Sequence, residues 1–387
     1  MKYNFDEIVN RRNTSSLKWD VLDNELPMWV ADMDFPTCKE VQEEIQKRAS
    51  IGAYGYSIIP DEFFESIISW WKKRHHFTFK KENMIFSTGV VAAISSIVRK
   101  ITSVGENVVV LSPVYNIFYN SILNNGRNVL ASNLIYKNYQ YEIDFVDLEE
   151  KLANKQTSLM ILCNPHNPVG KIFTKEELEK IGELCFKYHV YVISDEIHCD
   201  ITRPHKEYIP FASVSEKCYI NSITCLAASK TFNLAGLQSA CVIVNDPFLY
   251  HKVWRGLNTD EVAEPNFFAI SANIAAFKYG EEWVNQLNEY LFNNKDFVEN
   301  FINKNIPSLK VIHSDATYLV WIDISSISND SVSFCKNLRE STGLYVSEGE
   351  EYGTNGKKFI RMNIATSRKN VLDGLNRLKF FVNKKDL

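Results

Sequence analysis

The middle of the chain alternates short, continuously apolar runs with longer stretches of helical pattern. We expect buried strands at residues 107–113 (NVVVLSP), 158–165 (SLMILCNP), 190–196 (VYVISDE), 218–224 (CYINSIT) and 239–246 (SACVIVND). Residues 174–189 predict a helix with Thr174 as its N-cap and with Leu178, Ile181 and Cys185 on one face. Apolar strands joined by helices indicate a mainly parallel sheet that is covered by helices on both faces.

The pattern changes after about residue 280. Residues 281–304 predict a long amphipathic helix, and residues 316–324 (ATYLVWIDI) and 358–365 (KFIRMNIA) predict strands. This indicates a second, smaller α+β domain that also collects the N-terminal segment. We therefore predict three divisions of the chain: an N-terminal segment (1–45), a large domain (46–280) and a small domain (281–387).

Composition narrows the class of protein. The 387 residues are 45% hydrophobic and carry a formal net charge of −4, which argues against a nucleic acid or an anionic membrane as partner. The eight cysteines form no CxxC pair, which favours a reducing compartment. No apolar run approaches the ~20 residues that span a bilayer, and the N-terminus lacks a signal-peptide pattern. We expect a soluble cytoplasmic enzyme, and we expect the basic stretch 70–76, which includes His75 and His76, to be the solvated face of a helix.

Polar side chains follow three of the predicted strands. Asn164 and Asn167 come after the second strand, Asp195 comes after the third with His198 close behind, and Lys230 follows the fourth. Ligands of such sheets bind at the carboxyl ends of the strands. An amide, a carboxylate and an amine at neighbouring strand ends therefore indicate a site. Lys230 also lies among small residues (LAASKTFNLAG), which leave room for a ligand beside its amine.

A further strand-to-helix turn lies earlier in the chain. Residues 84–88 lead to Gly89, and a helix with an apolar stripe follows. Glycine lets the backbone approach a ligand closely, and the free N–H groups of a first helical turn bind anions.

These parts together fit pyridoxal phosphate. That cofactor requires a lysine amine for a Schiff base and a carboxylate that keeps its ring nitrogen protonated. It also requires a hydrogen-bond donor near its phenolate oxygen and an anion site for its phosphate. Lys230, Asp195, Asn167 and the Gly89 turn meet these four requirements in that order.

The ordered motifs also carry a resemblance. LPMWVADMDFPTC, YGYS, STGVVAA, SPVYNIF, NPHNPVGK, SDEIHCD, SKTFNLAGLQ and FIRMNIATSR occur in the order found in the fold-type I aminotransferase family. Within it, the chain resembles the C–S β-lyases of the MalY/PatB, or cystathionine β-lyase, branch. The resemblance covers nearly the whole chain. It implies the fold-type I α/β architecture, with a mainly parallel seven-stranded sheet in the large domain.

The resemblance also implies roles for residues. Lys230 would form the Schiff base and move the substrate's Cα proton, Asp195 would pair with the pyridine nitrogen, and Asn167 would bind the phenolate oxygen. Tyr115 would stack on the ring, and His198 stands where aspartate aminotransferases carry a tyrosine, which favours the lyase. The phosphate would be bound by Gly89, Val90, Val91 and Ser229. Ala227 replaces a serine that is frequent in the family, which puts one phosphate contact in doubt.

Three further residues have implied or hypothetical roles. Arg361 would hold the substrate carboxylate, and Tyr56 would reach into the active site of a partner subunit, which implies a homodimer. We hypothesise that Trp29, in the WVADMDF stretch, shapes the substrate pocket. No group of residues has convincing metal-ligand spacing, including Asp32, Asp34, His198, Cys199 and Asp200, so we expect no metal.

The sequence therefore favours a pyridoxal-phosphate-dependent C–S β-lyase. It would act by α,β-elimination on L-cystathionine or another S-substituted cysteine. An aminotransferase shares the early steps of this reaction and is the alternative. A third possibility is a binding or regulatory protein that keeps the fold and cofactor, although intact Lys230, Asp195, Asn167 and Arg361 argue against a pure binding role.

Overall fold

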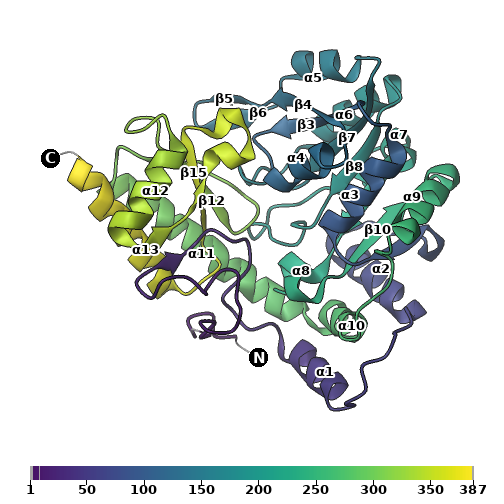
Figure 1. Cartoon of the computed structure of the whole chain (residues 1–387), viewed down its shortest axis with the longest axis horizontal. Coiled ribbons are helices and arrows are strands. Elements are labelled where there is room, and N and C mark those ends of the chain that lie inside the picture. Colours follow the sequence, from purple (N-terminus) through teal and green to yellow (C-terminus); the bar gives the residue numbers. More distant parts are fainter. Residues whose placement is uncertain (1–2, 8, 386–387) are drawn as a thin grey trace.

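The computed structural model describes residues 3–7 and 9–385, which form two domains side by side (Figure 1). The large domain is built on a seven-stranded sheet in the order β2-β10-β9-β8-β7-β3-β4. Its strands are β2 (Met84–Ser87), β3 (Asn107–Ser112), β4 (Asn128–Asn133), β7 (Thr157–Cys163), β8 (Tyr191–Asp195), β9 (Ser222–Leu226) and β10 (Ala240–Val244). β10 runs antiparallel to both of its neighbours, β2 and β9, and all other pairs in this sheet are parallel. The mainly parallel seven-stranded sheet is thus confirmed.

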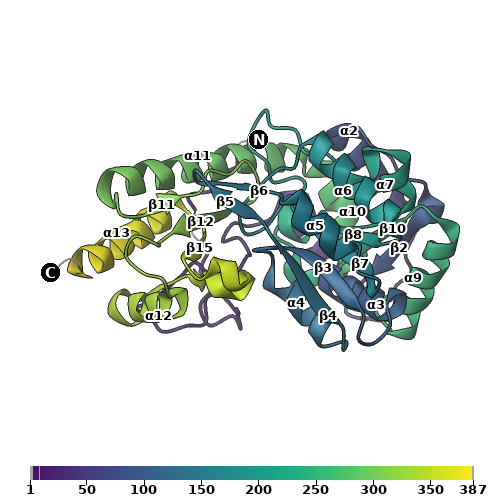
Figure 2. The same ribbon diagram turned by 90° about the horizontal axis from the view of Figure 1, so that it is seen from above.

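Helices cover both faces of this sheet, as Figure 2 shows from above. On one face, α3 (Val90–Ile101) and α9 (Pro247–Thr259) bury apolar side chains such as Ile94, Ile97 and Val253. On the other face lie α5 (Phe145–Leu152), α6 (Lys175–Lys187) and α7 (Glu216–Ile220). The N-cap prediction for α6 is confirmed, because Thr174 and Glu177 form a capping box.

One strand prediction is wrong at its start. Residues 218–220 belong to helix α7, and the strand β9 begins only at Ser222. The Ser215 side chain accepts a hydrogen bond from the backbone N–H of Cys218 and so caps a helical turn. Cys218 then packs against Gly182 of α6, where a Cβ on that glycine would lie 2.2 Å from the sulfur. The apolar character of this stretch therefore reflects the packing of α7 against α6.

The small domain has a four-stranded sheet in the order β11-β12-β15-β14. Its strands are β11 (Lys310–Val311), β12 (Leu319–Asp323), β14 (Ser347–Glu348) and β15 (Phe359–Asn363), and its helices are α11 (Glu281–Asn305), α12 (Ser331–Thr342) and α13 (Arg368–Lys385). The predicted helix from residue 281 is α11, which runs from the small domain to the large one (Figure 2). The N-terminal strand β1 (Leu26–Pro27) pairs with β13 (Leu344–Tyr345). The division points at residues 45 and 280 stay predictions.

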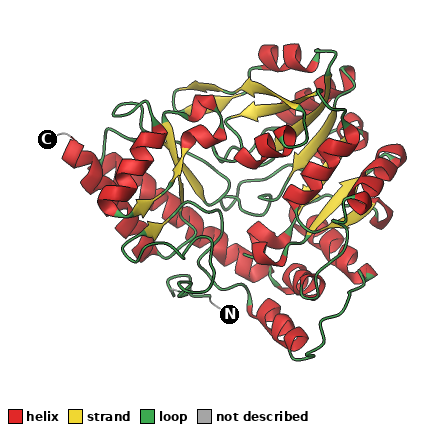
Figure 3. Cartoon of the chain, in the orientation of Figure 1, coloured by secondary structure: helices red, strands yellow, loops and turns green. Residues whose placement is uncertain are grey.

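The remaining elements connect or flank the two sheets (Figure 3). They are α1 (Lys39–Ala49), α2 (Asp61–His75), α4 (Asn116–Leu123), the short α8 (Ala228–Thr231), α10 (Ala269–Tyr279) and the hairpin of β5 (Ile135–Lys137) and β6 (Gln140–Glu142). Among the residues that the structure describes, no helix combines the length and apolar character needed to cross a bilayer.

Candidate active site

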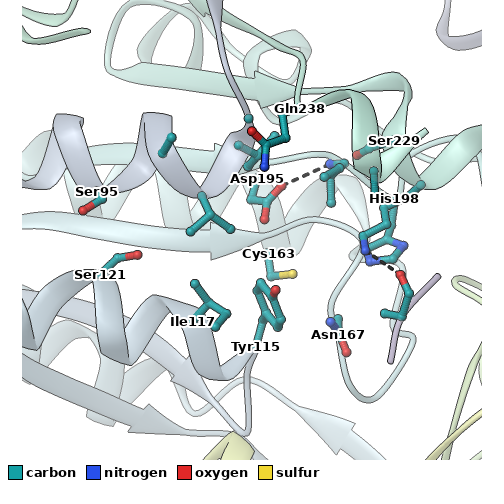
Figure 4. A pocket seen from close by; sticks show the side chains of 18 of the residues that line it. Ser95, Tyr115, Ile117, Ser121, Cys163, Asn167, Asp195, His198, Ser229 and Gln238 are labelled. Atoms are coloured by element: carbon teal, nitrogen blue, oxygen red, sulfur yellow. Dashed lines mark hydrogen bonds between the residues drawn. The ribbon is translucent and has the colours of Figure 1, made fainter. Parts of the chain in front are cut away.

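A cavity of about 670 Å³ lies at the carboxyl ends of the central strands (Figure 4). Its wall includes Tyr115, Asn167, Asp195, His198, Ser229 and Lys230. The strands β7 and β8 end at Cys163 and Asp195, and both of these residues face it. The polar side chains that follow these strands thus lie together around one cavity, as the sequence predicts.

Lys230 lies on the four-residue helix α8, just after β9. Its Nζ donates a hydrogen bond to the backbone carbonyl of Ala31 at 2.5 Å. Burial lowers the pKa of this amine to about 8, against the opposing pull of the Asp32 carboxylate. About a tenth of this lysine is therefore an uncharged amine at pH 7 and about half of it at pH 8, and the uncharged amine is the form that can act as nucleophile and base.

Asp195 lies between two cysteines in the sheet, because its register partners are Cys163 on β7 and Cys225 on β9. One carboxylate oxygen accepts from the backbone N–H of Ile197 at 3.2 Å. Burial raises the pKa of Asp195 to about 7, although the nearby Lys230 amine acts to lower it. Such a carboxylate gains strongly from a positively charged ligand group.

The start of α3 forms another part of the wall. Gly89 has φ +154° and precedes the helix, and a Cβ built on it would meet no atom within 4 Å. The cavity is lined by Thr88, Gly89, Val90 and Val91. Since the first N–H groups of a helix have no partner within the helix, this twelve-residue helix offers an anion site on the cavity.

Tyr115, Asn167 and His198 approach the cavity from different elements (Figure 4). Burial raises the pKa of Tyr115 to about 12 and lowers that of His198 well below its usual value, so both side chains are neutral. The Nδ1 of His198 is buried and has no hydrogen-bond partner in the described part of the chain. Asn164, by contrast, donates to the carbonyl of Ile209 and is not on the cavity wall.

Arg361 reaches the same region from β15 of the small domain. Its Nη1 lies 3.3 Å from Oδ1 of Asn167, and its Nη2 donates to the backbone carbonyl of Trp29 at 2.9 Å. Its Nε is buried and finds no partner among the described residues. The indole of Trp29 stacks on Tyr345 at 4.8 Å and lines a separate cavity. The structure therefore brings only the backbone of Trp29 to Arg361, not its ring to the main cavity.

Tyr56 is fully exposed and does not line the cavity of its own chain. It belongs to the stretch between α1 and α2, which has no regular secondary structure and also exposes Ile51, Tyr54 and Ile58. A role in a partner's site stays a prediction.

Sequence reasoning missed several residues of the site. Cys163 was treated as a core residue, yet it also lines the cavity. Ser239 contributes a buried hydroxyl that lacks a partner within the described residues. Ala31 and Tyr318 lie far from Lys230 along the chain, and only the fold brings them to it. The one feature of the sequence that could have pointed to Ala31 is its place two residues after Trp29 in the motif LPMWVADMDFPTC.

A cluster beside the site corrects the prediction for His75. The side chain of this histidine is only 6% exposed, and its Nε2 lies 3.0 Å from Oδ1 of Asp200. With Cys199 they are, among the described residues, the one group that could hold a metal ion. However, Asp200 also accepts from Trp70 Nε1 and Thr231 Oγ1. Its carboxylate is thus occupied by donors, and it ties α2 to the residue next to Lys230.

The sequence profile of the class I and II aminotransferases matches residues 24–378. The chain belongs to this family. It is 37% identical to cystathionine beta-lyase PatB of Bacillus subtilis over 382 residues, which cover 97% of this chain and 99% of that protein. This full-length similarity confirms the resemblance to the C–S lyase branch.

Two solved structures support the same placement. Cystalysin from Treponema denticola, which contains a pyridoxal 5'-phosphate cofactor, superposes with a TM-score of 0.96 at 30% identity, covering 99% of this chain and 100% of its own. The pyridoxal-phosphate-bound C–S lyase from Staphylococcus hominis, complexed with L-cycloserine, gives 0.93 at 34% identity and covers 99% and 98%. The predicted fold-type I architecture is confirmed by these matches.

The residues of the cavity fit pyridoxal phosphate. The buried amine of Lys230, with its lowered pKa, and the buried carboxyl of Asp195 can supply the covalent partner and the counter-charge for the ring nitrogen. The open space at Gly89 and the start of α3 suit a phosphate. The unpartnered His198 Nδ1 and Ser239 hydroxyl are buried polar atoms of the kind that a polar ligand satisfies.

Proposed function

We propose that this protein binds pyridoxal phosphate and catalyses α,β-elimination on S-substituted L-cysteines such as L-cystathionine. The products are pyruvate, ammonia and a thiol. The observation that carries this proposal is the meeting of Lys230 and Asp195 in one buried cavity beside a helix N-terminus. The full-length similarity to PatB and to the C–S lyase from Staphylococcus hominis supports the choice of reaction.

The bound cofactor supplies an electron-poor ring that stabilises negative charge at the substrate's Cα. Asp195 keeps the ring nitrogen protonated, because an ionised carboxylate in this buried position favours a positive partner. The N–H groups at the start of α3, with Ser229, bind the phosphate. Tyr115 covers one face of the ring with its aromatic side chain.

Lys230 moves the proton. Its amine would hold the cofactor covalently when no substrate is bound, and would be free to act as a base when substrate is present. The freed amine then removes the Cα proton, for which its lowered pKa of about 8 suits it near neutral pH. The thiolate leaves from Cβ, and water completes the release of pyruvate and ammonia.

Arg361 and Asn167 orient the substrate and cofactor. The guanidinium of Arg361 is buried, and its Nε has no partner among the described residues, so it can form charge-assisted hydrogen bonds to the substrate's carboxylate. Asn167, which is already in contact with Arg361, binds the cofactor's phenolate oxygen. His198 lies next to this position as a neutral side chain.

We further propose that the enzyme is a cytoplasmic homodimer. The exposed apolar side chains of Ile51, Tyr54, Tyr56 and Ile58 support a contact with a second copy. In such a dimer, Tyr56 would reach the phosphate end of the partner's cavity. Analytical ultracentrifugation of the wild type and of Tyr56→Ala tests the oligomeric state, and we expect a dimer. A separate measurement of cofactor binding should show weaker binding in Tyr56→Ala.

A substrate comparison tests the proposed reaction against the aminotransferase alternative. Purified holoenzyme is given L-cystathionine alone, or L-alanine or L-aspartate together with a 2-oxo acid. We expect kcat/KM for cystathionine cleavage to exceed that for either transamination by at least about 100-fold, with Lys230→Ala inactive in all assays. Faster transamination than cleavage would contradict the proposal.

A further inference from the structure

One backbone oxygen joins two side chains at the centre of the site. The carbonyl oxygen of Ala31 accepts hydrogen bonds from Lys230 Nζ at 2.5 Å and from Tyr318 Oη at 2.9 Å. Lys230 comes from α8 of the large domain, and Tyr318 directly precedes the small-domain strand β12. Because both groups donate to the same oxygen, the Lys230 amine and the Tyr318 hydroxyl lie close to each other. The mechanism proposed above assigns no role to Tyr318.

Tyr318 is held rigidly. Its side chain is fully buried, and its ring packs edge-on against His198 with centroids 5.9 Å apart. The residue before it, Thr317, has φ +62°, which is a strained conformation for a β-branched side chain. Strain of this kind persists only where the surroundings determine the backbone, and it is frequent at functional sites.

The surroundings of Thr317 do determine its backbone. Its N–H donates to the carbonyl of Ile201 in the large domain, and its Oγ1 accepts from the N–H of Leu319. The preceding Ala316 is held by the buried amine of Lys295, which donates to its carbonyl at 2.6 Å. Contacts from both domains thus fix the point at which Tyr318 enters the site.

The other partner, the carbonyl of Ala31, is equally fixed. Asn363 donates to the carbonyls of Val30 and Asp32 on either side of it, and Arg361 donates to that of Trp29. These bonds hold the segment in one orientation. Because the Ala31 carbonyl cannot turn away, its oxygen is a fixed acceptor for the Lys230 amine.

We propose that Tyr318 is a positioning residue for Lys230, and that its hydroxyl and the Ala31 carbonyl hold the free amine while Lys230 carries the substrate's Cα proton. This inference rests on the proposed function. A neutral amine has two N–H groups and one lone pair. An N–H donated to the Ala31 oxygen fixes the rotation about the Cε–Nζ bond and hence the direction of the lone pair.

The tyrosine hydroxyl suits this task for two reasons. Burial raises the pKa of Tyr318 far above its usual value, so the phenol keeps its proton and remains a donor to the Ala31 oxygen. Its own oxygen still has lone pairs that can accept from the amine once that amine is protonated. The proton taken from Cα therefore stays on Lys230. The Tyr318 phenol and the Ala31 carbonyl orient the resulting ammonium group but do not take the proton from it.

The test compares Tyr318→Phe with Tyr141→Phe in the holoenzyme. Tyr141 is a matched control, since it is also a buried tyrosine and its hydroxyl accepts one hydrogen bond, from Trp321 Nε1, away from the cavity. The measured reaction is exchange of the Cα proton of L-alanine for deuterium, followed by NMR. This exchange needs Lys230 to move the proton but needs no leaving group. Failure of the wild type to cleave cystathionine would therefore not affect this test.

We expect Tyr318→Phe to slow the exchange by about 10- to 100-fold with little change in KM, because misorientation of a base affects the proton-transfer step. Tyr141→Phe should stay within about twofold of the wild type. Exchange at the wild-type rate in Tyr318→Phe would overturn the proposal, as would an equal slowing in both variants.

A second readout uses the apoenzyme. The rate at which it takes up pyridoxal phosphate should rise with pH, with a midpoint near the Lys230 pKa of about 8. In Tyr318→Phe the Lys230 ammonium loses the Tyr318 oxygen as an acceptor, so the midpoint should move to lower pH. A merely structural loss would not move it, and an unchanged midpoint contradicts the proposal.

If Tyr318→Phe does not fold, a measurement on the wild-type protein still tests the proposal. A crystal structure with an unreactive amino-acid analogue that releases Lys230 from the cofactor would locate the free amine. We expect Nζ within hydrogen-bond distance of both the Ala31 oxygen and Tyr318 Oη. An amine that points elsewhere would overturn the proposal.

Discussion

Burial moves the pKa values of Lys230 and Asp195 towards each other, the amine from 10.5 down to about 8 and the carboxyl from 3.8 up to about 7. The two groups reach one cavity from neighbouring strand ends, and each opposes the other's shift only in part. Near neutral pH, a fraction of the amine is therefore already uncharged, while the carboxyl ionises readily beside a cation. These are the two protonation states that binding a pyridine aldehyde requires.

Asp195→Asn should retain the cofactor but lose most of the activity. The amide cannot stabilise a proton on the ring nitrogen, so the electrostatic support for negative charge at Cα is lost. We expect kcat to fall by about 10²- to 10³-fold, the range typical of one preorganised charge. Stopped assays of pyruvate measure this. Asp195→Glu, which keeps the charge, is the control and should retain more activity than Asn.

Arg361→Lys should impair substrate binding while the cofactor stays bound. A lysine keeps the positive charge but cannot make the two parallel hydrogen bonds of a guanidinium. We expect kcat/KM to fall by about 10- to 100-fold, as follows from the loss of one charge-assisted bond. The visible absorbance of the bound cofactor should not change. A variant with wild-type kcat/KM would show that the carboxylate binds elsewhere.

Lys295 gives a pH-dependent contribution to stability. Burial lowers the pKa of this amine from 10.5 to about 7. Between those values the folded protein holds an uncharged amine while the unfolded chain is protonated, so stability rises with pH across this window. Below pH 7 both states are protonated, and the cost of the buried charge is present in full.

Lys295→Met should remove this slope, which is ~1.4 kcal/mol per pH unit for one proton. Urea unfolding at several pH values between 7 and 10 measures the difference from the wild type. Lys304→Met, at an exposed position of the same helix, is the control and should follow the wild type. Parallel stability curves for Lys295→Met and the wild type would contradict the assigned pKa.

Asp200→Ala should destabilise the protein strongly. Asp200 is buried and accepts from His75, Trp70 and Thr231, and the loss of one partner from a buried charged network costs about 3–5 kcal/mol. Asp296→Ala is the control, since its pair with Arg203 is half-exposed and should cost less than about 1 kcal/mol. Equal midpoints of urea unfolding for the two variants would contradict this role.

The sequence located the parts of the site that follow strands, and it could do so for a physical reason. Apolar runs reveal buried strands, and the parallel arrangement brings residues such as Asp195 and Lys230 to one edge of the sheet. The error at residues 218–220 arose because a short apolar run has no periodicity that separates a strand from a helical turn. His75 was misjudged because its basic neighbours are exposed, while only tertiary contact with Asp200 explains its burial.

Other features depend on contacts that no local pattern encodes. Tyr318 directly precedes strand β12 in an apolar stretch that predicts only the core, yet its hydroxyl meets Lys230 at the Ala31 carbonyl. The indole of Trp29 stacks on Tyr345, whose ring also contacts the Arg339 guanidinium, and so does not line the main cavity. The proposed role of Tyr56 depends on a second copy of the chain, which sequence reasoning could reach only through resemblance.

The measurement that tests the central claim most directly follows pyruvate and free thiol together. Purified holoenzyme is incubated with L-cystathionine in the absence of any 2-oxo acid, with Lys230→Ala as control. We expect equimolar release of both products over many turnovers, abolished in the control. A single stoichiometric half-reaction that becomes catalytic only after a 2-oxo acid is added would contradict the account and identify an aminotransferase.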